Sequence, residues 1–166
     1  MIDHFIMFAA YNRWANKRLY DVAGQLTSEQ YRQDCAVAFN SMQGTLNHIL
    51  IGDTVWMSRF QQTQHTIGGL DELLHEDHSA LESARLQMDQ RIAGYVESLD
   101  PAALGSAFTY SPITLPEPVT MQLGVALAHM FNHQTHHRGQ AHAILTRLTG
   151  EAPPLDLIYF QIERQV

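Results

Sequence analysis

Apolar side chains recur every three or four residues along four long segments of this chain, a spacing that few folds other than packed α-helices accommodate. The first such segment gives one apolar face about five turns long. Its apolar positions are Phe8, Tyr11, Ala15, Leu19, Val22 and Leu26. Thr27 and Gln30 then have the spacing of a capping box, which predicts a short helical turn.

Two further helices are expected before residue 101. Ser41 is a suitable N-cap for a helix that runs to about residue 62. Its core stripe contains Met42, Leu46, Ile49, Trp56 and Phe60. Gly68-Gly69 breaks the chain, and a third helix then ends at Asp100-Pro101. Its apolar positions are Leu81, Ala84, Met88, Ile92, Tyr95 and Leu99.

The fourth helix is expected to start near Thr120 and to end at Gly150, with apolar positions in heptad spacing. Residues 101–119 before it carry four prolines and the strand-like run SAFTYSPITLP, which predicts an extended crossover with at most a short β segment. The tail LDLIYF is expected to pack on the helices or on a partner. These features predict an all-α fold, a four-helix bundle with long crossover connections, as one domain spanning residues 1–166.

The charge balance and the termini restrict the class of protein. Seventeen acidic residues against ten basic ones give a net charge of −7, which repels a polyanion, so nucleic-acid binding is disfavoured. The N-terminus lacks the basic region of a signal peptide, and no stretch approaches the ~20 apolar residues of a membrane span. The single cysteine, Cys35, forms no internal disulfide. A cytoplasmic protein without a membrane partner is therefore expected.

Five of the ten histidines lie within HMFNHQTHHRGQAH, near the C-terminus. At about 100° per residue, His129, His133 and His137 fall within an arc of about 80° that overlaps the apolar stripe. His136 lies on the flank of this arc, and His142 points away from it. Histidines at i and i+4 present their imidazoles side by side, which suits chelation of one metal ion. A single buried histidine is more often a hydrogen-bonded core residue, but three in one row favour a metal site, because burying them without partners is costly.

A metal site needs a further ligand from another helix. The candidates elsewhere in the chain are His4, His48, His65, His75 and His78. The last three lie in a polar, acidic stretch and are expected to be solvated. His48 is favoured because Gly44 and Gly52, each costing about 1 kcal/mol relative to Ala inside a helix, remove bulk on either side of its imidazole. The alternatives are that Gly44 only lies near the helix start and that Gly52 only allows another helix to pack closely.

The strings TLNHIL around His48 and NHQTHHRGQ from Asn132 to Gln140 resemble the DinB/YfiT-like superfamily of metal-binding helical bundles. The opening YNRWANKRLY and the string WMSRF resemble the same family. The resemblance implies a four-helix bundle with long crossovers and a metal site formed by His48, His133 and His137. It leaves His129 as a core or neighbouring residue, although helical spacing does not exclude His129 as a ligand.

Relatives in this superfamily include thiol-dependent transferases and isomerases, and many others have no established activity. The resemblance therefore implies a divalent metal ion, a small-molecule substrate such as a low-molecular-weight thiol, and a homodimer. Three neutral imidazoles leave the charge of the ion uncompensated, so transferase or hydrolase-like chemistry is expected. Zn²⁺ and Ni²⁺ both suit these ligands. The sequence identifies no general base beside the site, and no catalytic residue is assigned.

Three other interpretations compete with this one. A di-iron carboxylate bundle needs paired Glu-x-x-His motifs, and the chain has one, Glu72 to His75. A hemerythrin-like site is suggested by His48-x4-Asp53, His78-x3-Glu82 and His133-x3-His137, but their order along the chain is wrong for that family. A metal-binding or dimeric interaction bundle without turnover stays open.

The residues that follow His137 also carry expectations. Gly139 is expected to allow close approach of another helix, and Gln140 to hydrogen-bond across the bundle. Arg138 either pairs with an acid, in the bundle or at a dimer contact, or is a solvated surface charge.

Overall fold

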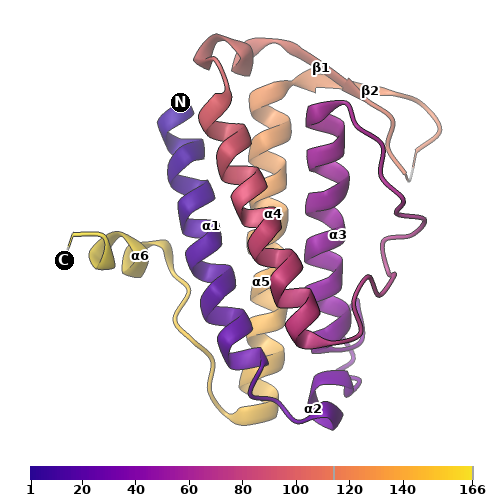
Figure 1. Cartoon of the computed structure of the whole chain (residues 1–166), viewed down its shortest axis with the longest axis vertical. Coiled ribbons are helices and arrows are strands. Elements are labelled where there is room, and N and C mark those ends of the chain that lie inside the picture. Colours follow the sequence, from indigo (N-terminus) through magenta and orange to yellow (C-terminus); the bar gives the residue numbers. More distant parts are fainter. Residues whose placement is uncertain (114, 166) are drawn as a thin grey trace.

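A computed structural model of the chain describes residues 1–113 and 115–165. The elements within these residues are α1 (Ile2–Ala23), α2 (Ser28–Arg32), α3 (Met42–Gln61), α4 (His78–Ser98), the 3₁₀-helix η1 (Pro101–Gly105), β1 (Ala107–Tyr110), β2 (Val119–Gln122), α5 (Leu123–Thr149) and α6 (Leu157–Glu163). The four long helices α1, α3, α4 and α5 lie side by side (Figure 1). The predicted all-α fold is confirmed.

Each long helix packs against two others. The helix α1 contacts α4 and α5, and α3 contacts the same two helices, so α1 and α3 occupy opposite corners of the bundle. The strands β1 and β2 lie at one end and α2 at the other (Figure 1). Long connections join α3 to α4 (residues 62–77) and α4 to α5 (residues 99–122).

The helix caps follow from local side chains. The hydroxyl of Thr27 accepts from the backbone N–H of Gln30 at 3.2 Å, and the side chain of Gln30 accepts from the backbone N–H of Thr27 at 3.0 Å, which confirms the capping box. The hydroxyl of Ser41 accepts from the N–H of Gly44 at 3.1 Å and starts α3 as predicted. The first helix ends at Ala23, so Leu26 lies beyond it.

The predicted start of the fourth helix is three residues too early. Thr120 lies in β2, opposite Thr109 of β1, and the two hydroxyls hydrogen-bond at 2.8 Å. Antiparallel pairing of these residues competes with helix formation, so α5 begins only at Leu123. The crossover is thus a 3₁₀-helix followed by a β-hairpin, and Thr114 of the strand-like run lies outside the described residues.

The apolar stripes of the four long helices meet in one core. Its most deeply buried members include Leu19, Met42, Leu46, Ile49, Leu81, Ile92, Leu127 and Met130. These residues come from all four helices, and removal of such side chains from water is the main driving force for the bundle. None of the described helices is long and apolar enough to cross a membrane.

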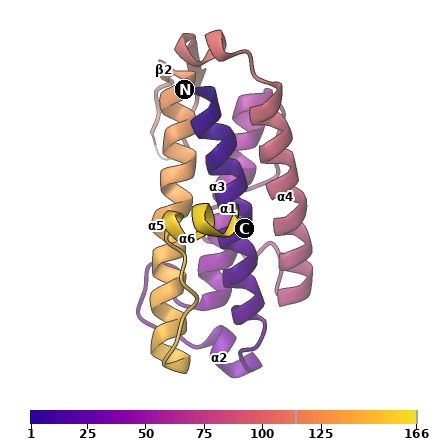
Figure 2. The ribbon, with the colours of Figure 1, turned by 90° about the vertical axis from the view of Figure 1, so that its left-hand side faces the viewer.

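The C-terminal tail packs on the bundle as α6, against α1 (Figure 2). Phe160 is buried against the rings of Tyr11 and Trp14, and the Tyr11 hydroxyl donates to the carbonyl oxygen of Leu155 at 2.7 Å. The outer face of α6 leaves Ile158 exposed. The homodimer stays a prediction.

Candidate metal centre

The fold brings together the three histidines His48, His133 and His137. His48 projects from α3, and the other two project from successive turns of α5. The Nε2 atom of His48 lies 3.3 Å from that of His133 and 3.2 Å from that of His137. His48 and His137 are buried, and His133 is half-buried. Within the described residues, this is the one group of three or more His, Cys, Asp or Glu side chains close enough to share an ion.

Hydrogen bonds to the far side of two rings fix where their protons lie. The Nδ1 atom of His48 lies 2.8 Å from the carbonyl oxygen of Leu70, which only accepts, so Nδ1 carries the proton. The Nδ1 atom of His137 lies 2.8 Å from the Gln140 side-chain oxygen, while the amide nitrogen of Gln140 faces His136. Both Nε2 atoms therefore present lone pairs, and each ring is oriented by a partner of the kind that supports metal-binding histidines.

These lone pairs converge on one point, and the donor set fits a divalent ion. Lone pairs of His48 and His137 that face each other at 3.2 Å repel unless a proton or a cation lies between them. Two nitrogens that each lie about 2.0–2.1 Å from one ion at tetrahedral angles are about 3.3–3.4 Å apart. The observed separations of 3.2 Å and 3.3 Å are close to this value, so the cluster could hold a metal ion with little rearrangement.

Burial keeps the three imidazoles neutral at neutral pH. Desolvation lowers the pKa of His48 to about 4, although its hydrogen bond to Leu70 opposes the shift. Desolvation and the two neighbouring imidazoles lower the pKa of His133 to about 3, and burial also lowers that of His137. Neutral rings keep their lone pairs, so protons compete little with a metal ion at pH 7.

An aromatic ring that the sequence analysis did not single out covers His48. Phe39 stacks on its imidazole with ring centroids 3.6 Å apart and an angle of 14°, and it meets His137 edge-on. A Cβ atom at Gly44 would run into the carbonyl oxygen of Phe39, so this glycine admits the segment that carries the ring. Gly44 therefore serves the site through Phe39 and does not clear space directly beside the imidazole.

Gly52 makes room for a different histidine than expected. A Cβ atom there would lie 2.7 Å from Cε1 and 3.1 Å from Nδ1 of His133, closer than side chains pack. Because Gly52 has no side chain, the ring of His133 from α5 can pack against α3 at this point and lie next to His48. Both glycines shape the site, but each acts on a neighbour of His48.

Replacing Gly52 with alanine is therefore expected to weaken metal binding by about 10–100-fold, since the His133 ring must move. A glycine-to-alanine change inside a helix normally raises the free energy of unfolding by about 0.5–1 kcal/mol. Gly52→Ala should not show this increase. The matched control is Gly94→Ala in α4, where a Cβ meets nothing within 4 Å and the gain should appear. Metal titration and urea unfolding measure the two effects, and unchanged metal affinity in Gly52→Ala would contradict the assignment.

The α3–α4 connection is fastened to α3 beside His48. Asn47 donates to the carbonyl oxygen of His75 at 3.0 Å and accepts from its N–H at 3.0 Å. Gln43 donates to the carbonyl oxygen of Glu76 at 2.7 Å. These bonds hold the segment that supplies the carbonyl oxygen of Leu70, so the tautomer of His48 depends on a connection far from it in the sequence.

A cavity of about 210 Å³ opens beside the cluster. Its lining includes His48 and His133 of the cluster together with Trp56, Arg59 and Tyr110. A larger cavity of about 500 Å³ elsewhere is bounded by the end of α1 and the segment after α5, and no histidine is among the described residues that line it. The smaller cavity combines concave shape with perturbed imidazoles, so it is the better candidate for substrate binding.

His129 also lines this cavity, but outside the three-histidine group. Its ring lies 4.9 Å from that of Trp56 and 6.0 Å from that of His133, by ring centroids. The side chain is exposed, and burial with the nearby charge of Arg59 lowers its pKa. His129 is thus a cavity residue beside the site, which rules out the core position considered for it.

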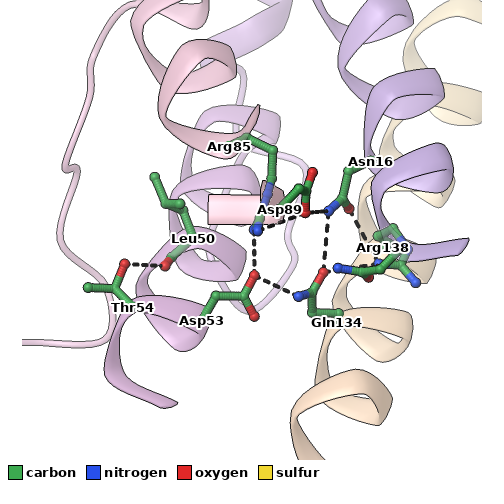
Figure 3. Close-up of polar contacts among 9 residues, drawn as sticks. Asn16, Leu50, Asp53, Thr54, Arg85, Asp89, Gln134 and Arg138 are labelled. Carbon is green, nitrogen blue, oxygen red and sulfur yellow. Dashed lines mark hydrogen bonds and ion pairs between the residues drawn. The ribbon is translucent and has the colours of Figure 1, made fainter. Parts of the chain in front are cut away.

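Arg138 is neither a surface charge nor a partner of an acid within the described residues. It is 2% exposed and donates to Asn12 and Asn16 of α1 and to Gln134 of α5. These contacts belong to a buried network that crosses the bundle (Figure 3). The guanidinium of Arg138 is held by side-chain oxygens of these three residues, whereas the amide nitrogen of Asn12 has no hydrogen-bond partner among the described residues.

The same network contains an ion pair between α3 and α4. Arg85 of α4 pairs with Asp53 of α3 and with Asp89 one turn along α4, and all three side chains are nearly inaccessible. Gln134 of α5 donates to Asp53 at 2.6 Å, and Asn16 donates to Asp89 at 3.0 Å (Figure 3). The network links all four long helices. Gln134 is also the neighbour of His133 in the sequence.

Two expectations for the residues after His137 are wrong. A Cβ at Gly139 would meet nothing within 4 Å, so no helix approaches it closely. Gln140 bonds to His136 and His137 on its own helix instead of across the bundle. A glutamine three residues after a histidine can reach the same helix face, and this spacing could have indicated the contact.

The motifs of the hemerythrin-like interpretation do not converge. Asp53 is engaged by Arg85 and Gln134, and His78 packs against the rings of Tyr20 and Tyr31. No carboxylate joins the three-histidine group within the described residues. His65, His75 and His78 are each half-buried, so the expectation that these three histidines are solvated is wrong.

The fold and the cluster together define a class of protein: a helical bundle with three converging histidines, two of them on one helix, that could hold a metal ion. The chain belongs to the DinB family, whose model matches residues 1–164. It is 26% identical to the protein named DinB from Bacillus subtilis (strain 168), over 94% of this chain and 92% of that protein.

The bundle also resembles a solved structure. A crystal structure of a conserved protein from Enterococcus faecalis superposes with a TM-score of 0.69, covering 87% of this chain and 96% of the other. The two sequences are 12% identical, so this likeness concerns the fold alone.

Proposed function

We propose that the protein binds one divalent metal ion, Zn²⁺ or Ni²⁺, through Nε2 of His48, His133 and His137. The observation that carries the proposal is the convergence of lone pairs on Nε2 of His48 and His137, whose protons are held on the opposite ring nitrogens. Family membership supports the same conclusion. Three histidines also leave coordination positions open, as catalytic sites require.

We further propose that the bound ion supports transfer of a low-molecular-weight thiol. A divalent ion held by neutral imidazoles keeps its full charge and lowers the pKa of a thiol that coordinates it. In the transfer, the thiol loses its proton to solvent and its sulfur bonds to an electrophilic carbon. A leaving group departs from that carbon with the electron pair of the broken bond.

The residues of the chain would contribute orientation and exclusion of water. Half-buried Phe39 covers one face of the His48 ring, so a substrate approaches from the cavity that His48 and His133 line. Leu70 and Gln140 hold two ring orientations through hydrogen bonds. Imidazoles held in this way need not change orientation during the reaction. Such preorganisation lowers the activation free energy.

Thiol consumption tests the transferase proposal directly. Cysteine and glutathione are each incubated with an aryl chloride electrophile and with protein that is loaded with Zn²⁺ or Ni²⁺ or stripped by a chelator. Loss of free thiol should require the metal-loaded protein and should disappear in His137→Ala. His142→Ala, a half-buried histidine outside the cluster on the same helix, should react as the unmodified chain does.

One outcome would replace the transferase by a binding protein. If metal stays bound at one equivalent and no thiol is consumed above the rate in buffer, the transferase proposal is wrong. The protein would then be a metal-binding bundle without this activity.

A further inference from the structure

Arg59 occupies an unusual position in the cavity beside the three histidines. Its guanidinium carbon lies 4.8 Å from the ring centroid of Trp56 and 4.6 Å from that of Tyr110, so aromatic rings hold it in two cation–π contacts. One N–H group donates to the carbonyl oxygen of Ser111 at 3.3 Å. A guanidinium carries five N–H donors, so most of them stay available to a ligand.

No acidic group of the described residues compensates this charge. Arg59 forms no ion pair within the described part of the chain, and the lining of its cavity contains neither Asp nor Glu. Among the residues that the structure describes, the other ionisable groups that line the cavity are three histidines and Tyr110. A locally positive cavity in a chain of net charge −7 favours a small anion over a cation.

The distance along α3 limits the size of such an anion. Arg59 follows Gly52, which contacts His133, by seven residues on one helix, or on the order of 10 Å of axis. Arginine side chains on a helix lean toward its N-terminus, which brings the guanidinium back toward the cluster. The cavity of about 210 Å³ is smaller than the roughly 300–1,000 Å³ typical of drug-sized ligands. A small, elongated molecule fits these dimensions.

From these features we infer that the substrate of this site carries a carboxylate, which Arg59 binds while the reacting group lies against the three-histidine cluster. A planar guanidinium matches a carboxylate through paired hydrogen bonds, and the two aromatic contacts leave its edge free for them. Arg59 is then a specificity-determining residue that contacts the carboxylate end of the substrate, away from the reacting atoms. The inference rests on the proposed function for the identity of the reacting end, but the recognition of a carboxylate is testable without it.

S-methylglutathione and its diethyl ester are the probes. The first presents two carboxylates and the second none, and the methyl group of both prevents thiol chemistry. Equilibrium binding is measured on metal-loaded and metal-free protein, with the unmodified chain, Arg59→Gln and Arg13→Gln. Arg13 is an exposed arginine on α1, the corner of the bundle opposite α3, so its replacement makes the same charge change at a distance.

Arg59→Gln is expected to weaken binding of S-methylglutathione by about tenfold or more and to change binding of the diester by less than about twofold. Arg13→Gln should change neither. Equal losses for the acid and the ester would assign Arg59 a packing role only. Unchanged binding of the acid, or no binding by the unmodified chain at about 10 mM, would also overturn the inference.

Metal content and thiol consumption are recorded on the same samples. Arg59→Gln should keep the metal of the unmodified chain, because Arg59 lies outside the three-histidine group. Failure of metal-dependent transfer is therefore observed separately from failure of carboxylate recognition.

Discussion

His48→Ala is expected to lower the metal affinity by well over 100-fold, since loss of even an outer-shell partner of a metal ligand costs about 10–100-fold. The variant should purify without stoichiometric metal, whereas the unmodified chain should retain close to one equivalent. His48 is the only ligand proposed from α3, and the two histidines of α5 alone form a weak two-coordinate site. Elemental analysis after purification and a subsequent Zn²⁺ or Ni²⁺ titration measure the effect.

The helical fold should survive this substitution. The apolar core does not depend on His48, so far-ultraviolet circular dichroism should remain that of a helical bundle. Metal should raise the free energy of unfolding of the unmodified chain by about 2.7 kcal/mol at 100 times the dissociation constant, and of His48→Ala by almost nothing. The control is His142→Ala, a half-buried histidine of the same helix outside the three-histidine group. A His48→Ala variant that still holds one equivalent of metal would refute the proposed site.

Replacing Arg85 with methionine is expected to lower the free energy of unfolding by about 3–5 kcal/mol. The substitution keeps much of the side-chain volume but leaves Asp53 and Asp89 buried without the cation that pairs with both. An uncompensated buried charge is far more costly than the net gain from the intact pair. Urea unfolding followed by tryptophan fluorescence provides the measurement.

The loss should be larger at pH 8 than at pH 5. Burial already raises the pKa of Asp53 to about 6, against the opposing effect of Arg85, so the folded state binds more protons than the unfolded state, whose carboxyl has a pKa of about 4. A raised folded pKa means that stability falls as pH rises through it. Without Arg85 this pKa moves higher, and a protonated Asp53 at pH 5 removes part of the penalty.

A surface ion pair supplies the control for this experiment. Lys17 and Asp21 pair at 2.8 Å on α1, with 64% and 45% of their side chains exposed. Lys17→Met should leave the free energy of unfolding nearly unchanged, because solvent screens the pair. If Arg85→Met were as mild as Lys17→Met at pH 8, the buried network would not stabilise the bundle in the manner described.

The buried network has a consequence for the metal centre. Gln134 of α5 bonds to Asp53 of α3, and each lies next in sequence to a residue of the site, His133 and Gly52 respectively. A buried hydrogen bond forms at only one alignment of the two helices along their axes, whereas apolar contacts allow the helices to shift relative to each other. The bond between Gln134 and Asp53 therefore fixes α5 against α3 at the level where the histidines meet.

Much of the fold could be predicted from local patterns. The three- and four-residue spacing of apolar residues indicated four long helices, and Thr27 and Ser41 marked two helix starts because their caps use neighbours within three residues. The start of α5 could not be placed in this way. Thr120 belongs to β2 because of its pairing with Thr109, eleven residues away, and no local pattern reports that contact.

For the candidate site too, some features could be predicted from the sequence and others required the tertiary structure. The spacing of His133 and His137 by itself determines that their imidazoles share a face, because an α-helix repeats every 3.6 residues. The amino-acid pattern and the family resemblance also directed attention to His48. Only the tertiary structure decided that Phe39 covers His48, that Gly52 admits His133, and that Arg59 lines the adjoining cavity. Each of these contacts joins segments that are distant in sequence, and their geometry follows from how the helices pack and not from the period of any one helix.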